Sequence, residues 1–351
     1  MRQQQQDGSS KTALAQSEFV NQKSENRRSL LVSTEKQSPK NAGQAKKVSG
    51  VRKVTVDPDD EGQRIDNYLQ RVTGGLPRSK LYKMIRKGEL RINGGRVKPE
   101  YRVKANDLVR IPPIFVEEKA PIQGVSPRLA ALLEKSVIYE DEALLVINKP
   151  AGLAVHGGSG VNIGLIESMR QVRPDARCLE LVHRLDRDTS GCLMIAKKRS
   201  MLRRLHANLR EGHIKKYYQA LVAGRWDKRV NEINAPLIKN QLASGERYVK
   251  VHADGKRSVT RFSVVKASAK ASLLDISLLT GRTHQIRVHT QYAGHSIIGD
   301  IKYGEHVVNQ QFKAQGHGRL FLHAAKLVFR TPVDDTLVEV VAPLDDAFSS
   351  V

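Results

Sequence analysis

The chain has 351 residues, 40% of them hydrophobic, and a formal net charge of +23, which suits two folded domains that bind a polyanion such as nucleic acid. A basic solvated surface and attachment to a membrane surface are the alternatives that the charge leaves open. No apolar run approaches the ~20 residues of a membrane span, no signal-peptide core is present, and two cysteines are too few for a zinc site or a disulfide framework, so a cytoplasmic protein without membrane contact is expected.

Residues 1–50 are rich in Gln, Ser, Lys and Asn, and their one apolar cluster, Leu30–Val32, is short. Such a segment cannot bury enough apolar surface to offset the entropy of ordering, so a disordered, basic polar tail is predicted. Nine Lys/Arg against four Asp/Glu give it a net charge of +5. Weak electrostatic contact with RNA and an extension without function both remain open.

Residues 52–112 are predicted to form a small domain of helices and strands. Apolar residues recur at helical spacing after Arg64 and again after Pro77, and Gly88 is a typical helix stop. Two short strands should follow, residues 90–95 with an Asn-Gly turn and residues 108–112.

The second of these helices pairs an apolar face with basic side chains. The basic residues are Arg78, Lys80, Lys83, Arg86 and Lys87. Residues 52–112 hold fifteen Lys/Arg and eight Asp/Glu, a net charge of +7, which favours RNA contact over an ordinary amphipathic surface helix. Two helices followed by a small basic sheet resemble an S4-type RNA-binding domain, and Gly88–Gly94 matches the turn after its second helix. Such domains occur in ribosomal proteins, tyrosyl-tRNA synthetases and RNA-modifying enzymes, so this module alone leaves the function open.

A linker is predicted for residues 113–135 and a second domain for residues 136–345. Two helices are expected there, from Ser200 to Gly212 and from Thr283 to Gly294, each with its first residue as the N-cap. Strands are expected at residues 274–278, 320–329 and 337–342. Helices between consecutive strands predict an α+β fold around a large, mainly antiparallel mixed β-sheet flanked by helices.

Three separated clusters hold the candidate catalytic residues. The first is His183–Gly191. It places Asp186 between Arg184 and Arg187, whose charges favour the ionised carboxylate, and an ionised aspartate can act as a nucleophile or a base. The other two clusters are Lys216–Val222 and Thr280–His289, and a strand ending in a Lys-Pro-Ala-Gly turn precedes all three.

The motifs Arg-Leu-Asp, Lys-x-Tyr-x-Ala and Gly-Arg-Thr-His-Gln-Ile-Arg, in this order, resemble the catalytic domain of the RluA family of pseudouridine synthases, the branch that modifies large-subunit ribosomal RNA. The resemblance covers residues 136–345 and, with the S4-type module in front, the chain from about residue 52. It implies the pseudouridine synthase fold and isomerisation of uridine to pseudouridine in 23S ribosomal RNA, at several sites. The implied partner is that RNA or a large-subunit precursor particle, and a monomer is expected.

Uridine becomes pseudouridine when the base leaves C1′, turns and reattaches through C5. This reaction has no net redox change and transfers no group, so neither a cofactor nor a metal is expected. The resemblance makes Asp186 the catalytic carboxylate. Attack on C1′, addition to the base and removal of a sugar proton remain open as its role, and a plain ion pair or turn cap is the structural alternative.

The resemblance implies roles for further residues. Arg287 pairs with Asp186, Tyr218 lies against the target base, and Arg184 fills the space left by the everted nucleotide. The alternatives are a surface position for Arg287, sheet core for Tyr218, and a phosphate contact or internal ion pair for Arg184. Tyr217 should point to the opposite face of the strand from Tyr218.

Ile286 and Leu185 are expected to line the pocket, and Lys149 is expected to contact phosphate. The alternatives are packing against the sheet for Ile286 and a surface role for Lys149. His284 and His289 suggest a metal site, but their spacing of five places them on different sides of a helix and no acid is suitably interleaved.

Two other functions fit parts of the sequence. A non-catalytic RNA-binding or ribosome-assembly protein built on the S4-type module is the main alternative. A fragment of an aminoacyl-tRNA synthetase is disfavoured, because no nucleotide-binding signature accompanies the module.

Overall fold

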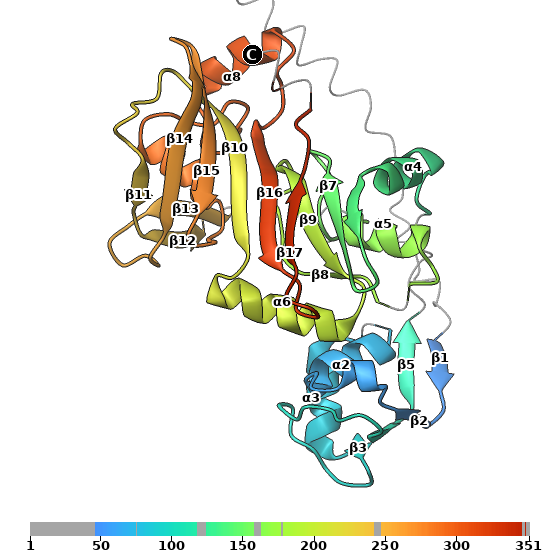
Figure 1. The fold of residues 1–351 in the computed structure, drawn as a ribbon. Coiled ribbons are helices and arrows are strands. Elements are labelled where there is room, and N and C mark those ends of the chain that lie inside the picture. Colours follow the sequence, from blue (N-terminus) through green and yellow to red (C-terminus); the bar gives the residue numbers. More distant parts are fainter. Residues whose placement is uncertain are drawn as a thin grey trace, which may run out of the picture. The chain divides into compact units, whose positions relative to one another are not determined.

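The computed structural model describes residues 46–74, 76–117, 124–157, 163–176, 178–241, 247–345 and 348 (Figure 1). The predicted tail lies outside the described residues as far as residue 45. Strands β1 (Lys46–Ser49) and β5 (Ile114–Glu117) pair with each other. None of the helices in the described ranges has the length and apolar character needed to span a membrane.

The first domain has two helices and a three-stranded antiparallel sheet of order β2-β4-β3. Its elements are β2 (Arg52–Thr55), the 3-10 turn η1 (Pro58–Asp60), α2 (Ile65–Val72), α3 (Arg78–Lys87), β3 (Arg91–Ile92) and β4 (Leu108–Ile111). The apolar faces of the two helices are buried, as the spacing predicted: Ile65 and Leu69 on α2, Leu81 and Ile85 on α3.

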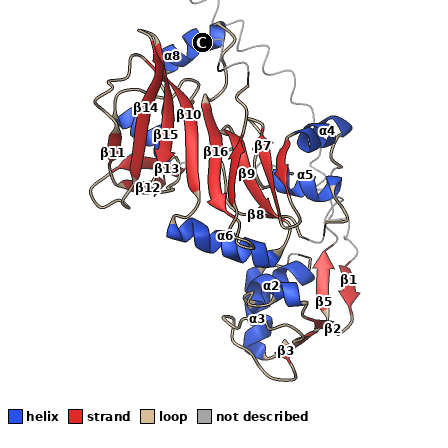
Figure 2. Cartoon of the chain, in the orientation of Figure 1, coloured by secondary structure: helices blue, strands red, loops and turns tan. Residues whose placement is uncertain are grey.

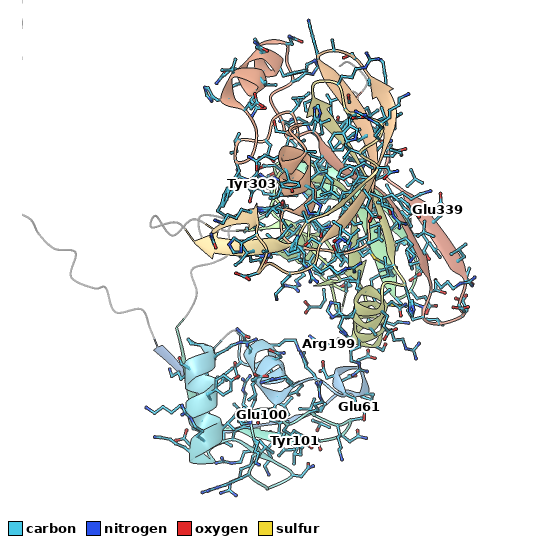
Figure 3. The ribbon with its side chains drawn as sticks, turned by 90° about the vertical axis from the view of Figure 1, so that its left-hand side faces the viewer. Glu61, Glu100, Tyr101, Arg199, Tyr303 and Glu339 are labelled. Atoms are coloured by element: carbon cyan, nitrogen blue, oxygen red, sulfur yellow. The ribbon has the colours of Figure 1, made fainter. Side chains whose placement is uncertain are left out.

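Polar contacts inside this domain fix its turns. Gly88 ends α3 in the left-handed conformation, with φ of 68°, and a Cβ there would lie 2.6 Å from Arg96 Nε. Asp107 is buried, and its carboxylate accepts hydrogen bonds from the Tyr101 hydroxyl and from Asn93 Nδ2 (Tyr101 is labelled in Figure 3). The five basic residues singled out on α3 are all exposed.

The second domain is built on a ten-stranded sheet of order β11-β14-β15-β10-β16-β9-β7-β6, counted over the described ranges, with β17 on β16 and β8 on β9. The strands are β6 (Val137–Glu140), β7 (Leu144–Lys149), β8 (Glu180–Leu181), β9 (Ser190–Ala196), β10 (Lys215–Ala223), β11 (Glu232–Asn234), β14 (Val259–Ala267), β15 (Ala271–Leu278), β16 (Leu322–Arg330) and β17 (Leu337–Val341). Strands β16 and β9 run parallel through two residue pairs, and the other pairings recorded in this sheet are antiparallel. The predicted mixed, mainly antiparallel α+β fold is therefore confirmed.

Helices pack around this sheet. They are α4 (Pro127–Lys135), α5 (Leu165–Val172), α6 (Arg199–Glu211), α7 (Gln285–Tyr292) and α8 (His306–Ala314), and a separate hairpin consists of β12 (Leu237–Gln241) and β13 (Arg247–Val251). Of these helices, α4, α5, α6 and α8 are labelled in Figure 2. Strand β9 is buried along its whole length, and its apolar residues form one core with residues of α5, α6 and α7.

Two local predictions differ from the structure. Residues 127–135, expected within the linker, form α4, whose Leu133 is buried in the core of the second domain. The Ser126 hydroxyl caps this helix by accepting a hydrogen bond from the Leu129 N–H. An N-cap serine is a helix start signal, which the prediction of a linker did not take into account. Ser200 is not an N-cap, because α6 begins at Arg199 and Lys198 holds the cap position without a side-chain hydrogen bond.

Candidate active site

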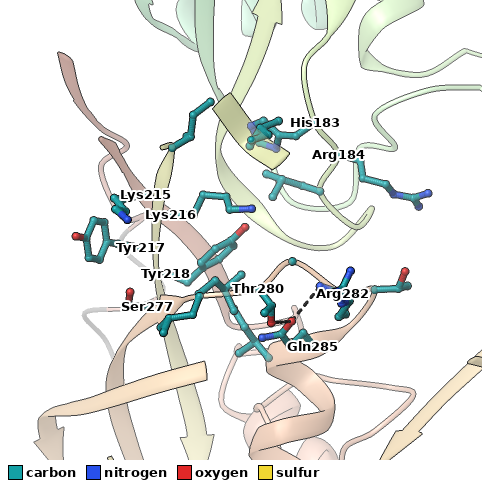
Figure 4. A pocket seen from close by; sticks show the side chains of 18 of the residues that line it. His183, Arg184, Lys215, Lys216, Tyr217, Tyr218, Ser277, Thr280, Arg282 and Gln285 are labelled. Carbon is teal, nitrogen blue, oxygen red and sulfur yellow. Dashed lines mark hydrogen bonds between the residues drawn. The ribbon is translucent and has the colours of Figure 1, made fainter. Parts of the chain in front are cut away.

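The three sequence clusters line one open cleft of about 1090 Å³ in the second domain. The loop before β9 contributes Asp186, and strand β10 contributes Tyr218. The turn before α7 and the start of that helix contribute residues 280–287. Figure 4 shows these segments facing one another across the cleft. Residues far apart in sequence are therefore brought to one place by the sheet order.

Arg287 joins two carboxylates. Its Nη1 lies 3.2 Å from Asp186 Oδ2, while its Nε and Nη2 donate to Asp300 Oδ2 and Oδ1 at 2.7 and 2.8 Å. Burial alone would lower the pKa of Arg287, but the hydrogen bonds and charge of Asp300, with those of Asp186, raise it above its usual value. The guanidinium is therefore a permanent cation beside Asp186.

Asp186 keeps one oxygen open to the cleft. Its side chain is 23% exposed, and Oδ2 is the oxygen that faces Arg287. Oδ1 has no hydrogen-bond partner within the part of the chain that the structure describes. The surface alternative for Arg287, whose side chain is 10% exposed, does not fit this geometry.

Tyr218 points into the cleft from an irregular point in β10. The pairing of β10 with β16 shifts register between Tyr217 and Gln219, and such a bulge changes the direction of a side chain. Tyr218 is 9% exposed and Tyr217 is 37% exposed, and they lie on opposite sides of the strand, as predicted (Figure 4). Burial and the nearby charge of Asp186 raise the pKa of Tyr218 above its usual value, so its phenol stays protonated at neutral pH.

Arg184 lies exposed at the cleft. Its guanidinium makes no hydrogen bond or ion pair with any described residue, which leaves it available to a ligand and argues against the internal ion pair. Leu185 and Ile286 are 5% and 4% exposed, and both line the cleft and belong to the domain core.

The phosphate contact predicted for Lys149 does not fit the structure. The side chain is fully buried, and Nζ donates to the carbonyl oxygens of Pro150, Leu153 and Arg187 at 2.8, 2.9 and 2.8 Å. All three N–H groups of the ammonium are thus used inside the protein. Burial lowers the pKa of Lys149 to about 7. Lys149 ties the turn after β7 to the loop that carries Asp186, and the sequence could not reveal that its amine is buried.

The start of α7 also differs from the prediction. Thr283 does not cap the helix; His284 holds the N-cap position in the left-handed conformation, with φ of 53°. The turn is instead held by Gln285, whose Oε1 accepts from Thr280 Oγ1 and from the Arg282 N–H (dashed lines in Figure 4). The buried amide of Gln285 also donates to Val259 O and Thr260 Oγ1, which fixes the turn to β14.

The histidines do not form a metal site. Among the described residues, no group of three or more His, Cys, Asp or Glu side chains could hold a metal ion. His289 is buried and bonds Thr260 Oγ1 and Ala235 O, a structural role. His284 lies 3.6 Å from Asp186, so it belongs to the cleft.

A close backbone contact anchors the loop that carries Asp186. Gly191 has φ of 104° and pairs with Ala324 across the parallel strands β9 and β16. A Cβ at Gly191 would lie 2.3 Å from Ala324 O, so only glycine allows the two strands to approach this closely.

Sequence reasoning missed three residues near the cleft. Asp300 and Tyr303 are buried beside Arg287, and Lys216 lies on the same side of β10 as Tyr218 (Figure 4). The available signal for Asp300 was an acid two residues after an apolar pair, Ile297 and Ile298, since an acid beside an apolar segment is rarely left without a partner. The Lys-x-Tyr motif contained Lys216, but no role was drawn from it.

Comparisons with known proteins agree with this architecture. A family model described as RNA pseudouridylate synthase matches residues 143–292, and one described as S4 domain matches residues 63–109. Ribosomal large subunit pseudouridine synthase C of Pasteurella multocida (strain Pm70) is 54% identical over 297 residues, which cover 84% of this chain and 91% of that protein. The protein of the same name from Salmonella typhimurium (strain LT2) is 53% identical over 301 residues, covering 85% of this chain and 94% of its own length.

A solved structure supports the fold. The structure named Human RNA Pseudouridylate Synthase Domain Containing 4 is similar with a TM-score of 0.53 at 24% identity. The match covers 63% of this chain and 93% of that one, and it concerns the fold.

Proposed function

The chain belongs to the RluA family of RNA pseudouridine synthases, which makes it an isomerase, and we propose that it converts uridine to pseudouridine in 23S ribosomal RNA, at several positions. The printed name of the bacterial relatives, ribosomal large subunit pseudouridine synthase C, supports this substrate. The match to the S4 domain and the exposed basic side chains of α3 support an RNA partner.

The observation that carries the proposal is the contact between Asp186 and Arg287 in the cleft. Arg287 holds Oδ2, and Oδ1 is the oxygen available to a substrate. An ionised carboxylate oxygen can attack C1′, add to the base or remove a sugar proton, and each of these routes begins with the same group. The reaction then requires the base to separate from C1′, turn and form a bond through C5, with loss of the C5 proton.

A uridine within a folded RNA must leave its stack to reach Asp186. Extruding a nucleotide costs a few kcal/mol, which contacts with the enzyme must offset. Arg184 is exposed at the cleft and has a planar cationic group, so it suits the space that the everted nucleotide leaves. Tyr218, protonated and buried beside the carboxylate, suits a position against the base, where it offers a ring face and a proton.

The domain division proposed from the sequence gives the two parts separate tasks. The exposed cations of the S4-type domain add phosphate contacts, and the second domain performs the chemistry. The substrate is the 23S RNA or a large-subunit precursor particle in the cytoplasm, and the enzyme acts as a monomer.

Release of tritium from RNA labelled at uracil C5 tests this proposal. The wild-type protein should release tritium from unmodified 23S RNA, and Asp186→Asn should bind the RNA normally but release none. Asp188→Asn is a matched control, because Asp188 lies in the same loop in a solvent-exposed pair with Arg187. A folded wild-type protein that binds the RNA and releases no tritium would support the non-catalytic alternative. Primer extension after carbodiimide treatment, in cells with and without the gene, would map the modified positions.

A further inference from the structure

We propose that His284 is a positioning residue for Asp186, which presents the Nε2–H of a neutral imidazole to the catalytic carboxylate while the Tyr303 hydroxyl fixes its tautomer. The inference rests on the proposed role of Asp186. The sequence motifs had not suggested a role for His284 in the reaction.

Geometry places His284 between an acid and a phenol. Its Nε2 lies 3.6 Å from Asp186 Oδ2, and its Nδ1 lies 2.7 Å from the Tyr303 hydroxyl. The distance to Asp186 is longer than a hydrogen bond, but such contacts often shorten once a substrate is bound. The imidazole thus approaches Oδ2 together with Arg287 Nη1.

The hydrogen bonds of Tyr303 identify the tautomer. Tyr303 is 2% exposed, and its hydroxyl oxygen accepts the N–H of Val249 at 3.1 Å. The hydroxyl proton needs an acceptor, and Nδ1 of His284 is the acceptor that the described residues provide. A nitrogen that accepts a proton in a hydrogen bond carries none itself, so in the neutral ring the proton is on Nε2 and points toward Asp186.

The backbone of His284 is held in an unfavourable conformation. A φ of 53° lies in the left-handed region, which a residue with a side chain adopts rarely and at a cost in energy. The N-cap position gains no side-chain cap there. The bond to Tyr303 and the edge-on contact of the two rings hold the imidazole in place, and strain of this kind gathers at functional sites.

The surrounding charges favour the neutral ring. Burial lowers the pKa of His284, and Arg287 and Lys302 lower it further, against the opposite effects of Asp186 and Asp300. Asp186 therefore faces the positively charged guanidinium of Arg287 and the neutral N–H donor of His284. Protonation at low pH would reverse the bond to Tyr303 and give Asp186 a second cationic partner, which stabilises the carboxylate and makes it a weaker nucleophile and base.

Single-turnover tritium release as a function of pH tests the inference. His284→Gln carries an amide N–H that does not titrate, so the acid limb of the rate should move to lower pH while the plateau stays within a few-fold of wild type. His284→Ala should lower the plateau roughly tenfold, the size typical of losing an orienting partner, with RNA affinity unchanged. Tyr303→Phe keeps the ring beside Arg287 and removes the hydroxyl, so it should lower the plateau less than His284→Ala does.

Control variants distinguish failure of this inference from failure of the proposed function. His306→Gln changes an exposed histidine outside the cleft and should leave the whole profile unchanged. Variants of His284 and Tyr303 with the wild-type profile would overturn the inference, as would a lower plateau with the acid limb unmoved, which is the mark of a purely structural residue. A wild-type protein that releases no tritium would instead contradict the proposed function.

Discussion

Asp300 binds two of the three guanidinium nitrogens of Arg287 and leaves the third for Asp186. The side chain of Asp300 is fully buried, and it also accepts the backbone N–H groups of Lys302 and Tyr303 through Oδ1. Burial would raise the pKa of Asp300, but Arg287 and these N–H groups hold it below its usual value. The carboxylate of Asp300 therefore fixes the orientation of Arg287 toward Asp186.

Asp300→Asn should destabilise the protein and impair the cleft. Removing one partner of a buried ion pair leaves the other charge uncompensated, so the free energy of unfolding should fall by about 3 kcal/mol in urea titrations. Asp188→Asn, in an exposed pair, should change it by less than about 0.5 kcal/mol. Equal unfolding curves for Asp300→Asn and wild type would show that Asp300 does not hold Arg287.

Lys216→Met should weaken RNA binding. The Lys216 amine lies in the cleft, makes no hydrogen bond or ion pair with a described residue, and has a pKa lowered by burial, so a phosphate is its natural partner. Loss of one phosphate contact should reduce the slope of log affinity against log salt by about one. Lys313→Met, at an exposed lysine outside the cleft, is the matched control and should change the slope less. The same slope for wild type and Lys216→Met would exclude this contact.

Lys149→Met should affect stability and leave RNA affinity alone. Three carbonyl oxygens would lose their donor, and the buried side chain would lose its polar contacts, which should lower the free energy of unfolding by roughly 3 kcal/mol. Denaturant unfolding measures this, and filter binding measures the affinity. Lys198→Met, at an exposed ion pair, should leave both unchanged. Weaker RNA binding by a protein of normal stability would restore the phosphate contact that the sequence suggested.

Because the fold keeps His183 neutral, the protein should be less stable in mild acid than at neutral pH. Burial, and then the charge of Lys216, lower the pKa of His183 to about 4 from its ordinary 6.5, and its Nε2 accepts the Met194 N–H. Between these two values the unfolded chain binds a proton that the folded protein does not, so this stabilisation is present above pH 6.5 and is lost as the pH falls toward 4. The loss should be roughly 3 kcal/mol, since one pKa unit corresponds to about 1.4 kcal/mol.

His183→Gln keeps an acceptor for Met194 and does not titrate. The unfolding free energy of wild type, measured relative to this variant, should decrease as the pH falls through this window. Parallel curves for the two proteins would show that His183 is not held neutral by the fold.

Much of the architecture follows from local patterns. The helices α2, α3 and α6 were predicted from apolar spacing and from glycine stops, because these signals lie within a few residues of one another. Start positions were less reliable. Ser200 lies inside α6, and His284 rather than Thr283 precedes α7, because Gln285 holds that turn through contacts with β14 that no local pattern encodes.

The composition of the cleft was predicted less completely than the fold. The motifs led to Asp186, Tyr218 and Arg287, which the fold brings together. Lys149 was misread because a lysine beside a turn gives no sign that its amine is buried among carbonyl groups. Asp300 is distant in sequence from Asp186, and its bond to Arg287 depends on the return of the chain after α7.

The parallel contact of β16 with β9 joins two antiparallel halves of the large sheet through only two residue pairs. Asp186 comes from the half built by residues 137–196, whereas Tyr218 and Arg287 come from the half built after residue 215. Neither half alone contains Asp186 together with Arg287, so catalytic competence should appear during refolding only after this junction has closed. During refolding, enzyme activity should then recover when the two halves of the sheet dock. This recovery should come later than the spectroscopic signal from strand formation within either half.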